Sequence, residues 1–122
     1  MSSAAAERAH TMVRLAKPVM FAGNSHAEVR INEPGGSLYA ELGEPRVMVY
    51  NATGSGYFVE QIGVVKAYLD KLIVAEHGGD IMFALLCLED AKAVKEALFD
   101  FFTAAEARLI ARKATSSSSA SA

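Results

Sequence analysis

Alternation of apolar and polar residues predicts two short strands early in the chain. The apolar positions are Ala27, Val29 and Ile31 in the first strand, and Leu38, Ala40 and Leu42 in the second. A period of two is typical of a strand with one buried and one exposed face. Proline and glycine within residues 32–36 favour a hairpin turn, so the two strands are predicted to pair antiparallel.

Two later runs contain almost no polar side chain and are predicted as strands that are covered on both faces. They span residues 46–50 and residues 81–88, and the second is predicted to lie in the centre of the sheet. A helix is predicted between them, so the three elements form a β-α-β crossover. Such a crossover joins parallel strands, almost always with a right-handed connection.

Apolar residues at spacings of three and four predict three helices. The first covers about residues 4–17 and ends before Pro18, and the second covers about 57–76, followed by Gly78. The third begins near Asp90 and has acidic residues at its start and basic residues at its end, which suits the helix dipole. Residues 106–112 also alternate, so an edge strand is an alternative there.

These elements predict an α/β (α+β mixed) fold. An N-terminal helix is followed by an antiparallel β-meander, then by the β-α-β crossover and a C-terminal helix. One mixed sheet of about four or five strands would carry the helices packed on it. The predicted organisation is an N-terminal helix or flexible arm over residues 1–17, one α/β domain over 18–114, and a disordered Ser/Ala tail over 115–122.

Composition and charge narrow the classes of function. The chain has 122 residues, of which 52% are hydrophobic, and a single cysteine, so one domain without an internal disulfide is expected. Residues 18–105 carry six basic and twelve acidic residues, and this net charge of −6 disfavours nucleic acid as a partner. No apolar run approaches the length of a membrane span. A cytoplasmic protein is expected, although the first 20 residues resemble a transit peptide in composition, which leaves organelle targeting open.

The loop of Thr53, Gly54, Ser55 and Gly56 is the first candidate binding site. A glycine-containing loop between a strand and a helix can present backbone N–H groups to an anion. The loop lacks the spacing of known phosphate-binding loops, and the alternative is that Thr53 or Ser55 caps the following helix. Glu89 and Asp90 are a second candidate, at the carboxyl end of the predicted central strand, with helix capping by Asp90 as the alternative.

Cysteine and histidine provide no clear site. Cys87 lies among leucines, where a thiol usually packs as a small apolar group. His10, His26 and His77 have no neighbours at the spacing typical of metal ligands. No catalytic residue, metal or cofactor is therefore predicted.

Residues 46–102 resemble a STAS domain, the anti-sigma-factor-antagonist class. The resemblance depends on the strand at 47–50, the loop 53–56, the amphipathic helix, the turn at Gly78 and Gly79, and the strand at 81–88. It implies a non-catalytic switch that binds proteins, with Ser55 at the position of the regulatory serine. The chain departs from the family because residues 32–45 are too few for the usual early helix and the Asp-Ser-Ser-Gly pattern is absent.

Two functions are therefore expected. The first is a non-enzymatic protein–protein interaction or regulatory module, self-associating as a homodimer or binding another protein through surplus apolar surface. The alternative is a small anion- or nucleotide-binding protein, or a small enzyme, with its site at residues 53–56 and the carboxyl end of 81–88.

Overall fold

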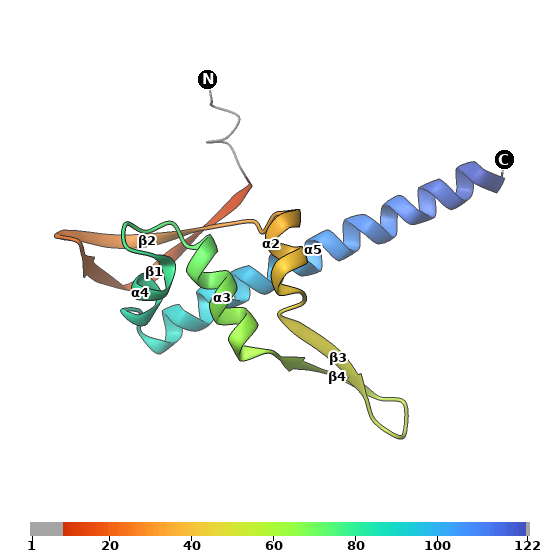
Figure 1. The fold of residues 1–122 in the computed structure, drawn as a ribbon, viewed down its shortest axis with the longest axis horizontal. Coiled ribbons are helices and arrows are strands. Elements are labelled where there is room, and N and C mark those ends of the chain that lie inside the picture. The colour runs from red at the N-terminus through yellow and green to blue at the C-terminus, as the bar shows by residue number, and fades with distance from the viewer. Residues whose placement is uncertain (1–8, 122) are drawn as a thin grey trace.

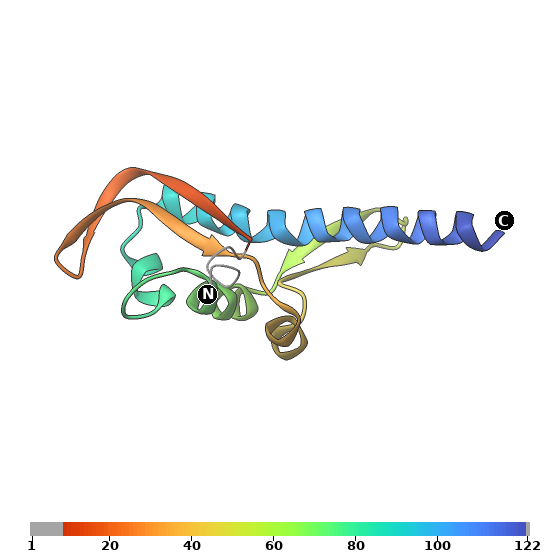
Figure 2. The same ribbon diagram turned by 90° about the horizontal axis from the view of Figure 1, so that it is seen from above.

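The computed structural model describes residues 9–121, with side chains as far as Thr115, and shows a long C-terminal helix running past a small body (Figures 1 and 2). The elements in chain order are β1 (His10–Phe21), β2 (Asn24–Asn32), α2 (Gly36–Leu42), β3 (Arg46–Tyr50), β4 (Gly56–Glu60), α3 (Ile62–Leu72), α4 (Gly79–Ala84) and α5 (Leu88–Ser121). The strands form two separate two-stranded antiparallel sheets, β1–β2 and β3–β4.

The first hairpin supplies one wall of the hydrophobic core. Ala22 and Gly23 form its two-residue turn with φ of 54° and 82°, the left-handed geometry that matches the twist of paired strands. Val13, Leu15, Val29 and Ile31 alternate with more exposed residues and are buried. The period of two therefore produces one apolar face, which packs against helices.

An irregularity in β1 explains how this hairpin is attached to α5. The register between β1 and β2 shifts between Arg14 and Val19, a stretch that contains Pro18, which has no N–H to donate. The N–H groups of Ala16 and Lys17 instead donate to the carboxylate of Asp90, at 2.8 and 3.1 Å. A side chain of α5 thus satisfies the backbone donors that the sheet leaves unpaired.

Three helical segments complete the core. Tyr68, Leu69 and Leu72 of α3 are buried, and after the helix the N–H of Val74 donates to the carbonyl of Arg30 in β2 at 3.0 Å. Gly79 begins α4 so close to α3 that a Cβ there would collide with the carbonyl oxygen of Leu69. The core face of α5 is made by Val94, Ala97, Leu98 and Phe99.

Only the first part of α5 contributes to this core. From Thr103 to Thr115 every described side chain is exposed except the half-buried Leu109. Figure 2 shows the helix continuing well beyond the first hairpin and α3. The second hairpin, β3–β4, touches α5 near Phe99 and Thr103 and projects from the body in a direction different from that of the helix (Figure 1).

The predicted N-terminal helix is wrong where it can be compared, because residues 10–17 belong to β1; residues 1–8 lie outside the described part of the chain. The helical spacing depended on Met12, which is 47% exposed. The buried pair Val13 and Leu15 has a period of two, which is the pattern that determines the local structure.

The second predicted strand is also wrong, since residues 37–42 lie in α2, and the Pro–Gly segment before them leads into a helix. Leu38 and Leu42 alternate with polar residues but are also four residues apart, so they share one face of a helix and pack against the core. Leucine, alanine and glutamate favour the helix over the strand here.

The predicted central strand at 81–88 is wrong, and it is the error with the largest consequence. Residues 79–84 form α4 and Leu88 begins α5, and within residues 81–88 only Met82 is buried. A short apolar run rich in leucine, methionine and alanine is compatible with a helix as well as a strand. The mixed sheet of four or five strands and its parallel crossover are therefore replaced by two antiparallel hairpins.

Other expectations are confirmed in part. Residues 27–32 lie in β2 and 46–50 form β3, although β3 is largely exposed instead of being covered on both faces. The helix predicted over 57–76 is α3, which begins only at Ile62, and the last helix continues through 106–112. The division into an arm, one domain and a tail over 115–122 stays a prediction.

Candidate protein-interaction site

The loop that was predicted to bind an anion is the turn of the second hairpin. The side-chain oxygen of Asn51 accepts hydrogen bonds from the backbone N–H of Thr53 and of Ser55, each at 3.0 Å, and from the hydroxyl of Thr53 at 2.7 Å. The N–H of Gly54 donates to the carbonyl of Asn51. Three donors that an anion would need are already used within the turn. A strand rather than a helix follows, so no helix dipole points at the loop.

The two predicted carboxylates have different surroundings and do not join this loop. Asp90 is buried and holds the first hairpin, whereas Glu89 is exposed in the first turn of α5. In both ribbon views the start of α5 and the tip of β3–β4 lie far apart (Figures 1 and 2). Loop and carboxylates therefore do not form one ligand site.

Asp90 is the most constrained ionisable group described here. Hydrogen bonds from the N–H of Ala16 and Lys17, and from the thiol of Cys87 at 3.2 Å, lower its pKa although burial acts in the opposite direction. The nearby positive charge of Lys17 adds to the lowering. Cys87 is half-buried and its thiol serves as a donor, so Asp90 and Cys87 act together in a structural contact.

Among residues 9–121, no three histidine, cysteine, aspartate or glutamate side chains are arranged to hold a metal ion. Within the same range, none of the helices has the length and apolar character needed to span a membrane.

The second hairpin carries the most exposed apolar surface. Its cross-strand pairs include Val47 with Val59 and Val49 with Tyr57, and alternation places these four side chains on one side of the sheet. Val47, Tyr57 and Val59 are 38%, 52% and 41% exposed, and Val49 is half-buried. We call these four residues the apolar hairpin face.

The other side of this hairpin faces α5 and is attached to it mainly by polar and cation–π contacts near its base. The guanidinium of Arg46 lies 4.2 Å from the ring of Phe58 and 4.6 Å from that of Phe99, and it donates to the hydroxyl of Thr103. Lys95 forms an ion pair with Glu60 at 2.8 Å. These contacts fix the base of the hairpin and leave its tip in solvent.

A groove of about 580 Å³ separates this hairpin from the exposed part of α5. Its apolar lining includes Met48, Phe58, Phe102 and Ile110, and Ile110 is 60% exposed. The hairpin and the distal part of α5 thus present neighbouring apolar surfaces. Surface of this kind usually marks contact with another macromolecule.

Comparison of the chain with models of protein families, with curated proteins and with solved structures found no match. The resemblance to STAS domains therefore stays a prediction, and so does a regulatory role for Ser55. Two of the features on which the resemblance depended are formed differently, because the loop ends in β4 and residues 81–88 are helical at both ends.

The sequence does not reveal the apolar hairpin face, because an uninterrupted apolar run usually indicates a strand covered on both faces. The signal that could have revealed the hairpin is the six-residue polar and glycine-rich segment 51–56 between two β-branched and aromatic runs. The local pattern does not distinguish a hairpin that is covered by a second layer from one that is left exposed.

Proposed function

We propose that this chain is a non-enzymatic protein-binding module that self-associates through the apolar hairpin face. The observation that carries the proposal is a two-stranded sheet with one uncharged side, Val47, Val49, Tyr57 and Val59, on which every residue except the half-buried Val49 is exposed. The contacts of this hairpin with α5 are near its base and on its other side, and a two-stranded sheet gains stability when a further layer covers it. A partner that covers this face supplies the layer.

A second copy of the chain is the partner that this face fits best. The four side chains carry no charge, so two such faces can meet without repulsion and without burying an unpaired ion. Aligned packing of two sheets about 10 Å apart interdigitates side chains of this size. A two-fold axis through the contact makes each copy present the same surface, as in most homodimers.

The alternative of an anion- or nucleotide-binding site at residues 53–56 has less support. Its backbone donors are engaged by Asn51, and the adjacent carboxylates that were to complete the site lie elsewhere.

The solution mass of the full chain, measured by sedimentation equilibrium over a range of concentrations, tests the proposal. We expect a concentration-dependent rise from the 13.0 kDa monomer toward twice that mass. In the double variant Val47→Thr/Val59→Thr the strand-forming β-branched shape is kept and the apolar contact is lost. We expect this variant to remain monomeric at concentrations where the parent is dimeric.

Val74→Thr is the matched control, because Val74 is 54% exposed and lies outside the hairpin. It should dimerise like the parent chain. A parent chain that stays monomeric up to millimolar concentration, or a double variant that dimerises as tightly as the control, would show that the proposal is wrong.

A further inference from the structure

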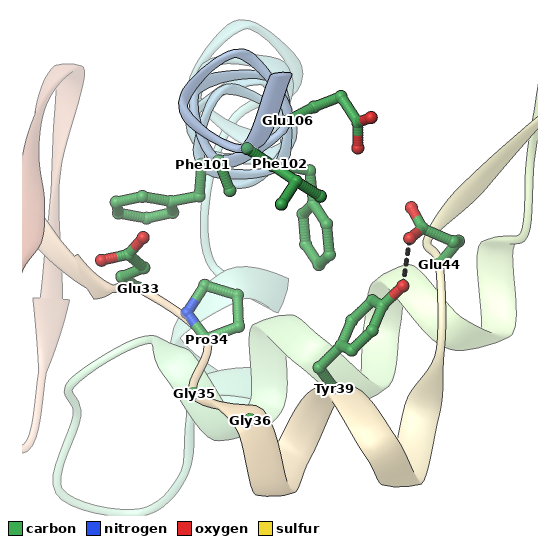
Figure 3. Close-up of a pocket in the computed structure, with 11 residues that line it drawn as sticks. Glu33, Pro34, Gly35, Gly36, Tyr39, Glu44, Phe101, Phe102 and Glu106 are labelled. Atoms are coloured by element: carbon green, nitrogen blue, oxygen red, sulfur yellow. Dashed lines mark hydrogen bonds between the residues drawn. The ribbon is translucent and has the colours of Figure 1, made fainter. Parts of the chain in front are cut away.

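A groove lies between α5 and the segment that leads from β2 into α2 (Figure 3). Its volume is about 310 Å³, and Pro34, Phe101, Phe102 and Leu109 provide most of its apolar wall. Figure 3 shows the Phe102 ring extending from α5 toward Tyr39, and the Phe101 ring extending toward Glu33. The space is sufficient for one or two apolar side chains of a partner rather than for a whole helix.

The charge of this groove has one sign. Glu33, Glu44 and Glu106 are among the side chains that line it, and no lysine, arginine or histidine is among them. Glu33 pairs with Arg108 at 3.2 Å, outside the lining. Glu44 accepts a hydrogen bond from the hydroxyl of Tyr39, which raises the pKa of that hydroxyl, and the negative charge of Glu106 adds to the rise. We call this surface the acidic groove.

Its walls are held in place by contacts within the chain. The Phe102 ring packs edge-on against Tyr68 at 5.4 Å between centroids and lies 6.1 Å from the Tyr39 ring. The hydroxyl of Tyr68 in turn donates to the carbonyl of Gly43 at 2.6 Å, just beyond α2. A groove with fixed walls loses little side-chain entropy when a ligand enters, which favours binding.

We propose that the acidic groove binds a cationic amphipathic helix of a partner protein. The partner's leucine- or phenylalanine-sized side chains would enter between Phe101, Phe102 and Pro34, in the usual arrangement of a helix in an apolar groove. Its lysine or arginine side chains would lie beside Glu44 and Glu106 at the rim. This is a second interface, which does not depend on self-association through the hairpin face.

Charge complementarity selects this occupant among the alternatives. A nucleic acid or an acidic peptide would bring like charge to Glu44 and Glu106, which costs binding energy. The distal part of α5 in a second copy is basic, with Arg108, Arg112 and Lys113, but Arg108 is engaged with Glu33 in its own chain. A helix from a different protein therefore matches better, and the second copy is an outcome that the experiment can detect.

Two synthetic helical peptides of about four turns test the proposal. Both carry leucine at positions i, i+3, i+4 and i+7; one has lysine and the other glutamate on the remaining face. Fluorescence anisotropy gives their affinity for the full chain, and amide NMR shifts locate the contact. We expect the lysine peptide to bind, with shifts at residues 33–44 and 101–109, and the glutamate peptide to bind at least roughly tenfold more weakly.

Removal of the rim charges should have a defined effect. Glu44→Gln/Glu106→Gln should lower the affinity for the lysine peptide roughly three- to tenfold. This loss of affinity should shrink when NaCl is raised from about 0.05 to about 0.5 M. Glu41→Gln/Glu96→Gln removes two exposed carboxylates that do not line the groove. This control has the same net charge as Glu44→Gln/Glu106→Gln, but it should bind the lysine peptide as tightly as the parent chain does. Ala105→Trp, which fills the groove, should abolish binding.

Equal affinity for the two peptides, equal effects of the two double variants, or shifts confined to 46–60 would each overturn the proposal. Dimerisation that disappears in Glu44→Gln/Glu106→Gln would show that a second copy occupies the groove, which also contradicts it. Repeating the titration with Val47→Thr/Val59→Thr separates the two proposals, because the groove should still bind peptide when the hairpin face no longer self-associates.

Discussion

The two β-hairpins of this molecule have the same topology and opposite surroundings. Ile31 and Val29 of the first hairpin are 0% and 2% exposed, whereas Tyr50 and Phe58 of the second are 69% and 54% exposed. The first hairpin lies against α3 and the early part of α5, whereas the second touches α5 near its base and projects away from the body (Figure 1). Burial here depends on which helices are adjacent and not on how apolar the strands are.

The two hairpins are also attached to α5 by carboxylates in different settings. The carboxylate of Asp90 lies inside the body and accepts two backbone N–H groups of β1. The carboxylate of Glu60 is on the surface and pairs with the ammonium of Lys95. A buried acceptor for backbone donors contributes more to stability than an exposed ion pair does. The first hairpin is thus part of the folding unit, and the second is a surface displayed by it.

The largest expected effect comes from a change in the layer that covers the first hairpin. Leu98→Ala removes a fully buried side chain of α5 and should lower the free energy of unfolding by about 2–5 kcal/mol, through lost burial and the cavity left behind. Leu109→Ala, the same substitution further along the helix at a half-buried position, should cost less than about 1.5 kcal/mol. Urea denaturation of both variants measures the difference. Similar losses would mean that the two parts of α5 are equally packed.

Sequence patterns predicted the parts of the fold that have a clear period and a conventional end. Val29 and Ile31 identified β2, and the stripe Val65, Leu69 and Leu72 identified the core face of α3. Patterns failed for short apolar runs, since residues 56–60 and 81–88 are compatible with a strand as well as with a helix. The choice there depends on tertiary contacts, such as the packing of Gly79 on α3, that no local window contains.

The candidate site was less predictable than the fold. Asp90 was correctly placed at the start of the last helix, yet its partners Ala16 and Lys17 are more than seventy residues away in sequence. The acidic groove combines Glu33 and Glu44 with Phe101 and Glu106, which become neighbours only when α2 packs beside α5. Self-association through surplus apolar surface stays a prediction, and the apolar hairpin face is the surface to which it now applies.

An intermediate effect is expected for the buried attachment of the first hairpin. Asp90→Asn should lower the Tm by several degrees at neutral pH, because an amide offers one acceptor oxygen to two N–H donors. The pKa of Asp90 is lower in the folded chain than in the unfolded chain, mainly through the N–H of Ala16. Its stabilising contribution is therefore complete above the unfolded pKa of about 4 and is lost as the pH falls through the lower folded value.

The difference in Tm between the parent and Asp90→Asn should consequently be constant from about pH 5 to 8 and should shrink in acid. Glu89→Gln is the control, because the carboxylate of Glu89 is exposed. This variant should show neither the lower Tm at neutral pH nor the change of that difference in acid. Thermal melts by circular dichroism over this pH range measure both variants. If the Tm difference between Asp90→Asn and the parent instead grew in acid, the pKa of Asp90 would not be lowered by its hydrogen bonds to β1.

The smallest effect should come from the matched attachment of the second hairpin. Glu60→Gln removes one partner of an ion pair whose Lys95 and Glu60 side chains are 32% and 36% exposed, so the loss should be at most about 1 kcal/mol and should fall as salt is added. Amide exchange should accelerate in β3 and β4 while the rates in β1 and β2 stay unchanged, since the hairpins share no core. If Glu60→Gln instead destabilised the whole chain as much as Asp90→Asn, the second hairpin would belong to the folding unit. Its apolar face would then need an explanation within the chain rather than in a partner.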